Sequence, residues 1–275
     1  MLVSGLIGFT LSLLVAYVSY KRHRLDKTGL IGATLLGTIV FTFGDIIFYI
    51  LMLLFFFSST FISHMSSLLL PSTHLLMDKK VKKHEARTII QVFANGGVLG
   101  FLSILYYLFP QPSIILLACI SMAASTADTW AGEIGIFSHQ ATRSIITHKP
   151  MVRGLSGGVT NLGFLASLAG SILIALVSLI YALFTHVWDP YLLLALFLCI
   201  TLGFIGSIVD SVLGELLQAK YLGLDAIMIT EHPYEDKHKL KLISGFRWMD
   251  NNMVNLLSNV IVVGLGYGII LLMRL

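Results

Sequence analysis

The sequence predicts an all-α fold, a polytopic membrane helical bundle of about eight transmembrane or re-entrant helices that forms one integral membrane domain over residues 1–275. The first observation behind this prediction is composition. The chain is 56% hydrophobic and only 12% charged, with a mean hydropathy of +0.88, whereas about a quarter of the residues in a soluble protein are charged. So few charges cannot coat a water-facing surface. The composition therefore excludes an ordinary soluble enzyme, a disordered chain and a nucleic-acid-binding module.

The second observation is the placement of the 18 lysines and arginines. Apart from Arg274, they fall into four clusters, at residues 21–27, 79–87, 143–153 and 220–247. Long continuous apolar runs separate the clusters, and a run of about 20 apolar residues spans the hydrocarbon core as a helix. Short basic loops stay in the cytoplasm. We therefore expect all four clusters on the cytoplasmic side of the cell membrane and both termini outside.

Each apolar run then predicts its helices in order. Residues 2–20 form a first helix that is retained, because its basic residues follow the apolar run instead of preceding it as in a signal peptide. Residues 29–63 leave only about 17 residues for each of two crossings, with a break near Gly44 and Asp45, so this pair is short, tilted or re-entrant. The remaining spans are two in residues 91–138, two in residues 156–217 and one in residues 252–273.

Two short segments repeat an acidic pattern at the cytoplasmic ends of the predicted fifth and seventh spans. Both read Asp-Thr/Ser-x-x-Gly-Glu, with Asp128 and Glu133 in the first and Asp210 and Glu215 in the second. A charge inside a membrane helix costs roughly 2.5–3.5 kcal/mol, so it usually marks a site or a pathway. The spacing places each Asp and its Glu on different helix faces, and the glycine before each Glu is expected to let the helix bend. The alternative is that these acids pair with loop cations or cap helix ends.

A glycine-rich turn lies between the two acidic segments. Lys149 and Arg153 precede it, Ser156, Gly157 and Gly158 form it, and Asn161 opens the next predicted helix. Exposed N–H groups at a helix N-terminus bind anions, and glycine lets the backbone approach closely. We therefore expect this turn to bind phosphate, although the pattern G-x-x-x-x-G-K-[ST] is absent. The alternative is a plain tight turn between two helices.

Asparagines mark two further helix starts. Asn251, Asn252 and Asn255 begin the last predicted helix after Asp250, which is a predicted N-cap, and Asn95 lies near the start of the fourth span. Their carboxamides are candidates for binding substrate. The alternative is that they join helices through hydrogen bonds, as asparagine often does in membranes. The nine histidines show no metal-binding spacing, and the two cysteines form no C-x-x-C pair.

Taken together, these segments resemble the integral membrane family known as domain of unknown function 92, which includes plant phytyl-phosphate kinase and animal transmembrane protein 19. The family is in turn distantly similar to phytol kinase, dolichol kinase and the membrane CDP-diacylglycerol synthases. Gly132 and Glu215 depart from the family pattern. The matching segments run in order over nearly the whole chain, as Q-V-F-A-N-G-G (91–97), S-T-A-D-T-W-A-G-E-I-G (125–135), K-P-M-V-R-G-L-S-G-G-V-T (149–160), G-F-I-G-S-I-V-D-S-V-L-G (203–214) and N-N-M-V-N (251–255).

The resemblance implies a CTP-dependent kinase that phosphorylates a prenyl (phytyl-like) monophosphate to the diphosphate at the cytoplasmic membrane face. Its partners are then membrane lipid, an isoprenoid phosphate and a nucleotide, and not nucleic acid. Asp128, Asp210 and Lys149 are the expected catalytic residues, and Mg²⁺ is expected on Asp128, Asp210 and Glu133. The expected phosphate- and substrate-binding residues are Arg153, Ser156, Gly157, Gly158, Asn161, Asn95, Asn251, Asn252 and Asn255.

Three other functions remain open at this point. A membrane cytidylyltransferase would make a CDP-lipid from the same parts and release pyrophosphate instead of CDP. A transporter or flippase also uses buried acids and repeated segments, although its polar groups would gather near the midplane instead of one side. A scaffold without chemistry would have little use for buried acids. The length of the lipid tail, the nucleotide preference, the oligomeric state and the role of Glu215 are left open.

Overall fold

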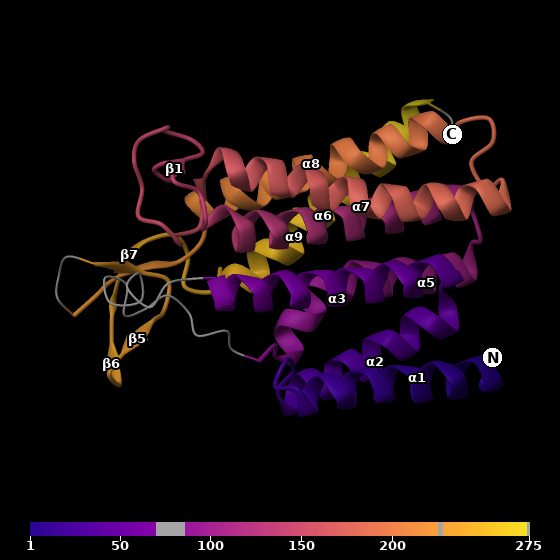
Figure 1. Ribbon diagram of the computed structural model, residues 1–275, viewed down its shortest axis with the longest axis horizontal. Coiled ribbons are helices and arrows are strands. Elements are labelled where there is room, and N and C mark those ends of the chain that lie inside the picture. The colour runs from indigo at the N-terminus through magenta and orange to yellow at the C-terminus, as the bar shows by residue number, and fades with distance from the viewer. Residues whose placement is uncertain (70–85, 225–227, 274–275) are drawn as a thin grey trace.

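A computed structural model describes residues 1–69, 86–224 and 228–273 of the chain. Within those residues the chain forms a bundle of eight helices, with a few short strands gathered at one end (Figure 1). The helices are α1 (Leu2–Lys21), α2 (Lys27–Phe43), α3 (Ile46–Leu69), α5 (Ile89–Leu108), α6 (Pro112–Gly135), α7 (Asn161–Thr185), α8 (Leu192–Leu216) and α9 (Asn251–Met273).

Seven of these eight helices in the described part of the chain are long and apolar enough to cross a membrane, and only the 17-residue α2 is shorter. The polytopic helical fold is thereby confirmed. The break expected near Gly44 and Asp45 is also present, because Gly44 caps the end of α2 and the Asp45 carboxylate accepts a hydrogen bond from Ile47 N–H at 3.1 Å, at the start of α3. At its other end α2 begins after Asp26, whose carboxylate accepts from Gly29 N–H at 2.6 Å.

Successive helices run in alternating directions, so that both termini lie at one end of the bundle and the strands at the other (Figure 1). The basic clusters at residues 21–27, 143–153 and 220–247 belong to the strand-bearing end, as does Arg87 before α5. This arrangement agrees with the expectation that the basic loops share one side of the membrane. Residues 79–83 of the second cluster lie outside the described residues.

Helix α6 is the centre of the bundle. Every residue from Ile114 to Ala127 is buried, and the helix packs against α3, α5, α7, α8 and α9. The other helices keep apolar side chains on their outward faces, as lipid contact requires. A polar side chain on the inner part of α6 is therefore surrounded by protein instead of lipid.

Short antiparallel strands form in the two longest described connections, where only basic loops are expected from the sequence. Runs of two to four residues are too short to show an alternating pattern, so these strands could not be predicted. The strands are β1 (Arg143–Ser144) with β2 (Gly158–Val159), β4 (Ile229–Thr230) with β3 (Lys220–Leu222) and β7 (Lys241–Ser244), and β5 (Tyr234–Glu235) with β6 (His238–Lys239).

Neither helix breaks at the glycine of its acidic segment, because α6 continues through Gly132 to Gly135 and α8 through Gly214 to Leu216. The two glycines differ in their surroundings. A Cβ on Gly132 would meet nothing within 4 Å, whereas one on Gly214 would lie 2.9 Å from Ser156 Cβ. Gly214 is thus a point of close approach between α8 and the glycine-rich turn.

Candidate functional site

Two carboxyl groups meet inside the bundle near its strand-bearing end. Asp128 on α6 and Asp210 on α8 lie within hydrogen-bonding reach of each other. Small residues one to two turns earlier bring the two helices together, since a Cβ on Gly203 would lie 2.6 Å from Ala123 Cβ and one on Gly206 would lie 2.5 Å from Ala124 Cβ. The repeated acidic pattern therefore places two carboxyl groups side by side.

Three polar side chains from α5 and α9 complete this group. Ser258 donates from Oγ to Asp210 Oδ2 at 3.0 Å. The carboxamide of Asn255 lies 3.3 Å from Asn95 Oδ1, and with its amide turned over it donates to Asp210 Oδ2 at 3.1 Å and to the Asn251 carbonyl at 2.9 Å. We call Asp128, Asp210, Asn95, Asn255 and Ser258 the acid-pair cluster.

Asn259 joins α9 to α6 beside this cluster. Its Oδ1 accepts from Ser121 Oγ at 2.8 Å, and its Nδ2 lies 2.6 Å from Ser125 Oγ. Ser125 in turn donates to the carbonyl of Asn95 at 2.9 Å. Asn259 therefore holds α9 against α6, whereas Asn255, one turn earlier on α9, lies at the acids.

The donor set of the acid-pair cluster suits Mg²⁺. This ion takes oxygen ligands and commonly uses one or two carboxylates together with substrate phosphates and water. Two carboxylates this close cannot both be ionised in a low-dielectric interior unless a cation lies with them. Across residues 1–69, 86–224 and 228–273, no three His, Cys, Asp or Glu side chains converge on one point. A cation here would therefore need ligands from a substrate.

Glu133 is not brought to the acid pair, in contrast to its expected role as a metal ligand. It follows Asp128 by more than one helical turn, and its backbone carbonyl accepts from Ser66 Oγ of α3 at 3.3 Å. Its carboxylate lies close enough to Arg87 to act on it electrostatically. The structure therefore reduces the protein carboxylates available to one cation from three to two.

The glycine-rich turn packs directly on the second acidic segment. Gly157 adopts φ +91°, and a Cβ there would overlap the side chain of Glu215. Glu215 also holds the segment that precedes the glycine-rich turn in the chain, since its carboxylate accepts from Ser144 Oγ at 2.5 Å and from Ile146 N–H at 3.3 Å. Gly158 pairs with Ser144 between β2 and β1. The role left open for Glu215 is thus structural support of the turn.

An anionic side chain of the protein already occupies the turn. The Ser156 N–H donates to Glu231 Oε1 at 2.6 Å. Lys220 lies nearby, with its Nζ donating to the Glu215 carbonyl at 3.1 Å. Burial lowers the pKa of Lys220, and the charges of Glu231 and Glu215 oppose that shift. One backbone N–H of the turn is therefore already bound to a carboxylate of the protein.

The two cations before the turn have different surroundings. Arg153 donates through its guanidinium to the carbonyls of Ile136 and Ser138, both at 2.8 Å, and so ties the loop to the end of α6. Lys149 is exposed, and no residue in the described part of the chain accepts a hydrogen bond from its Nζ. Asn161 is also exposed, as the first residue of α7 after its cap Thr160. Of these three side chains, only Arg153 has its donors engaged by the fold.

Asn251 and Asn252 lie at the start of α9. Asp250 caps the helix as the sequence predicts, because its Oδ1 accepts a hydrogen bond from Met253 N–H at 2.9 Å. Asn252 donates to the other carboxylate oxygen of Asp250 at 3.1 Å, and Asn251 is exposed. Neither side chain forms a hydrogen bond with Asp128 or Asp210. They therefore belong to the helix end instead of the acid-pair cluster.

Several residues of the site were not found from the sequence. Ser125 and Ser258 are single hydroxyls in apolar helices, and only their neighbours in space give them a role. Glu231 lies within the fourth basic cluster, and nothing in the sequence near it indicates that its carboxylate contacts the turn. Arg87 is predicted from the sequence only as a member of the second basic cluster. Its position directly before the helix cap Thr88 is the one sequence feature that sets it apart from the other cations of that cluster.

Comparisons with known proteins extend these observations. The family model for the integral membrane protein DUF92 matches residues 10–263. Protein PGR of Arabidopsis thaliana is 32% identical over 266 residues, which cover 90% of this chain and 90% of the relative. The uncharacterized membrane protein MJ0933 of Methanocaldococcus jannaschii is 31% identical over 221 residues, which cover 79% of this chain and 83% of the relative. No solved structure matches the chain.

Proposed function

This chain belongs to the integral membrane protein family DUF92, and from that premise we propose that it is a magnesium-dependent kinase that transfers the γ-phosphoryl group of CTP to a prenyl (phytyl-like) monophosphate. The reaction takes place at the cytoplasmic face of the cell membrane. The observation that carries the proposal is the contact between Asp128 and Asp210 at the strand-bearing end. Two acids at that depth can meet a nucleotide from water and a lipid head group from the membrane.

The reaction balances without a strong general base. A phosphate oxygen of the prenyl monophosphate attacks the γ-phosphorus of CTP. A new P–O bond forms, the bond from the γ-phosphorus to the bridging oxygen of the β-phosphate breaks, and CDP leaves with that oxygen. The acceptor is already an ionised phosphate, so catalysis needs positioning and charge neutralisation above all.

Each part of the site has a role in this scheme. Asp128 and Asp210 would hold Mg²⁺, which supplies charge neutralisation to the phosphates when bound. Ser258 and Asn255 orient the Asp210 carboxylate. The Ser156 N–H of the turn would bind a nucleotide phosphate once Glu231 moves away, and exposed Lys149 in the same connection would add a positive charge.

The position of the cluster favours this reaction over transport. A transporter of this kind binds its cargo near the middle of the membrane. The acid-pair cluster instead lies near the ends of α6 and α8 and near the starts of α5 and α9. That position suits a substrate whose tail stays in lipid while its head reaches the interface.

A phosphoryl-transfer assay with purified protein in lipid nanodiscs tests the proposal. We expect prenyl monophosphate to become the diphosphate with CTP and Mg²⁺, at a lower rate with ATP, GTP or UTP, and not at all in EDTA. Release of pyrophosphate with formation of a CDP-lipid would assign the chain to the cytidylyltransferases. Absence of any nucleotide turnover would overturn the enzymatic proposal.

A further inference from the structure

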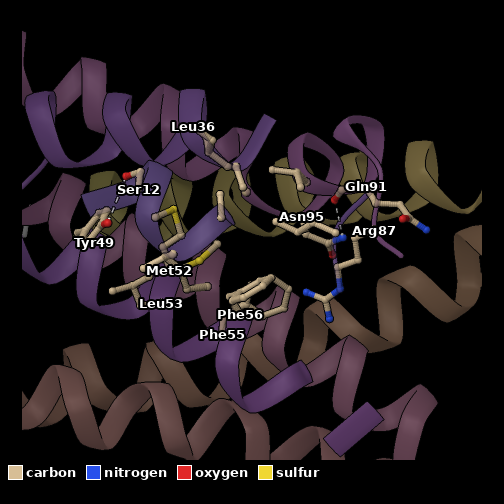
Figure 2. A pocket seen from close by; sticks show the side chains of 17 residues that line it. Ser12, Leu36, Tyr49, Met52, Leu53, Phe55, Phe56, Arg87, Gln91 and Asn95 are labelled. Carbon is tan, nitrogen blue, oxygen red and sulfur yellow. Dashed lines mark hydrogen bonds between the residues drawn. The ribbon is translucent and has the colours of Figure 1, made fainter. Parts of the chain in front are cut away.

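A narrow apolar slot lies between α1, α2, α3 and α5, beside the acid-pair cluster (Figure 2). Leu36, Met52 and Phe56 are among the side chains along its length. The free space is about 690 Å³ when its open side is included. Most of the lining side chains are apolar, so the slot suits a hydrocarbon chain.

The slot has a polar group at each end, as Figure 2 shows. At one end, Ser12 Oγ and Tyr49 Oη lie 3.2 Å apart and satisfy each other. At the other end lie Arg87, Gln91 and Asn95. Ser12 is near the middle of α1, and Arg87 directly precedes the cap of α5 at the strand-bearing end. The slot thus runs from the membrane surface toward the middle of the bundle.

Arg87 provides a fixed cation at the surface end. Its guanidinium lies over the rings of Phe55 and Phe56, at 5.7 Å from each centroid. Its backbone is held by Arg24, whose carbonyl accepts at 3.0 Å, and by Asp26, whose N–H donates at 3.1 Å. No residue in the described ranges accepts a hydrogen bond from this guanidinium, whose donors match phosphate oxygens in geometry.

The same end of the slot adjoins the acid-pair cluster. Asn95 lines the slot, and its Oδ1 lies 3.3 Å from the carboxamide of Asn255. Met122 also lines it and belongs to the same helix as Asp128. A chain lying in the slot would therefore end with its head group beside the acids.

We propose that this slot binds the prenyl tail of the monophosphate substrate and that Arg87 binds its phosphate, an inference that rests on the function proposed above. The mostly apolar lining suits a hydrocarbon tail. The charge favours a phosphate head group, because no residue in the described ranges accepts a hydrogen bond from the Arg87 guanidinium, and the nearby Glu133 carboxylate acts on it only through its charge. The slot is thus a binding site for a prenyl phosphate.

Crosslinking without nucleotide tests the place of binding. Purified protein in nanodiscs is irradiated with geranylgeranyl monophosphate that carries a diazirine at the far end of its tail, and the adducts are mapped by mass spectrometry. We expect adducts near Ser12, Tyr49 and Met52, and competition by unlabelled geranylgeranyl monophosphate. Adducts confined to the outer faces of α7 and α8, or no specific adducts, would overturn the assignment.

Filling the slot tests its contact with the tail. Ala33 lines it from α2, whereas Ile31 on the same helix faces outward. Ala33→Phe displaces part of the tail, and the loss of two or three buried methylenes weakens binding about tenfold to hundredfold. We expect this loss for geranylgeranyl monophosphate and little change for dimethylallyl monophosphate, which has one isoprene unit. Ile31→Phe is the matched control, and Ala33→Leu serves as a milder variant. Unchanged binding of the long substrate by both Ala33 variants would refute the slot.

Arg87→Met tests the head group. A charge-assisted phosphate contact corresponds to about tenfold to hundredfold in affinity, so we expect that loss for geranylgeranyl monophosphate and none for geranylgeraniol. Arg22→Met, in the exposed basic cluster before α2, is the control. Equal losses for the phosphate and the alcohol would show that Arg87 only shapes the slot, against the proposal.

These outcomes separate the slot from the proposed reaction. If the diazirine probe labels the slot in protein that transfers no phosphoryl group, the binding site is upheld and the kinase proposal is refuted. Phosphoryl transfer with unchanged KM in Ala33→Phe and with adducts elsewhere would refute the slot and uphold the kinase.

Discussion

The carboxyl groups of Asp128 and Asp210, which are 82 positions apart in the chain, lie within hydrogen-bonding reach of each other between α6 and α8. Their helices run in the same direction and touch through Gly203 and Gly206, so the two acidic segments reach the same depth. Ser258 and Asn255 fix one of the two carboxyl groups from α9. This contact is the basis of the proposed magnesium site and of the first prediction.

Replacing either acid should remove activity without unfolding the protein. We expect Asp128→Asn and Asp210→Asn each to lower turnover about a hundredfold or more, because the lost charge neutralised the transferred phosphoryl group. The unfolding temperature without Mg²⁺ should hold, since two carboxyl groups this close are not both ionised when no cation lies with them, and a neutral amide replaces one of them. Asp189→Asn, in the exposed loop between α7 and α8, is the control. Near-normal turnover in both acid variants would make the pair structural.

Lys149→Ala should weaken nucleotide binding. In the proposed scheme the exposed ammonium, which belongs to the same connection as Ser156, contributes a charge-assisted contact to the nucleotide, so we expect a loss of about tenfold to hundredfold in CTP affinity. Lys82, a cation of the second basic cluster, lies outside the described residues and so does not serve as the comparison. Exposed Lys241 on β7 is the matched control. Titration with CTP that gives equal affinities for the Lys149 and Lys241 variants would reduce the turn to a helix connection.

Glu231→Gln should strengthen nucleotide binding. The Glu231 carboxylate holds the Ser156 N–H at 2.6 Å and must leave before a phosphate can bind there. A neutral amide competes less well than a carboxylate for that N–H, so we expect CTP affinity to rise by about fivefold. Isothermal titration in EDTA measures this effect apart from the metal. Glu235→Gln, in the exposed hairpin of β5 and β6, is the control. An unchanged or lower affinity would show that nucleotide binds elsewhere.

Gly157 and Gly132 should respond in opposite ways to alanine. Gly157→Ala places a side chain at φ +91° and against Glu215, so we expect a loss of at least about 1–2 kcal/mol in folding free energy and of nucleotide binding. Gly132→Ala adds a methyl group where nothing lies within 4 Å, inside α6, so we expect a gain of about 0.5–1 kcal/mol. Thermal unfolding of the Gly157→Ala and Gly132→Ala variants measures both effects. Equal unfolding temperatures would contradict the account of the turn.

The helices were predictable from the sequence because apolar runs and charge clusters report directly on membrane crossing. The break at Gly44 and Asp45 was predictable for the same reason, since the run between two basic clusters is short for two spans. The short strands were not, because two to four residues carry no visible periodicity. The likeness of the two acidic segments indicated a shared depth, but their contact depends on Gly203 and Gly206, whose packing partners lie on another helix.

The roles of the two glutamates were also beyond the sequence. Glu133 and Glu215 occupy equivalent positions in the repeated pattern, yet Glu215 supports Ser144 and the glycine-rich turn while Glu133 lies by Arg87. Glu215 is reached by the connection after α6, whereas Glu133 is reached by the segment before α5. A repeat in sequence therefore predicted the acid pair and could not predict the neighbours of the glutamates.

Transfer of label from CTP to lipid tests the central claim most directly. Protein in nanodiscs receives geranylgeranyl monophosphate and Mg²⁺ with CTP labelled at either the γ- or the α-phosphate, and the lipid products are separated. The account predicts that label enters geranylgeranyl diphosphate only from the γ-position, with CDP released in equal amount, and that Asp210→Asn abolishes the transfer. Label that enters the lipid from the α-position, or no transfer from either position, would contradict it.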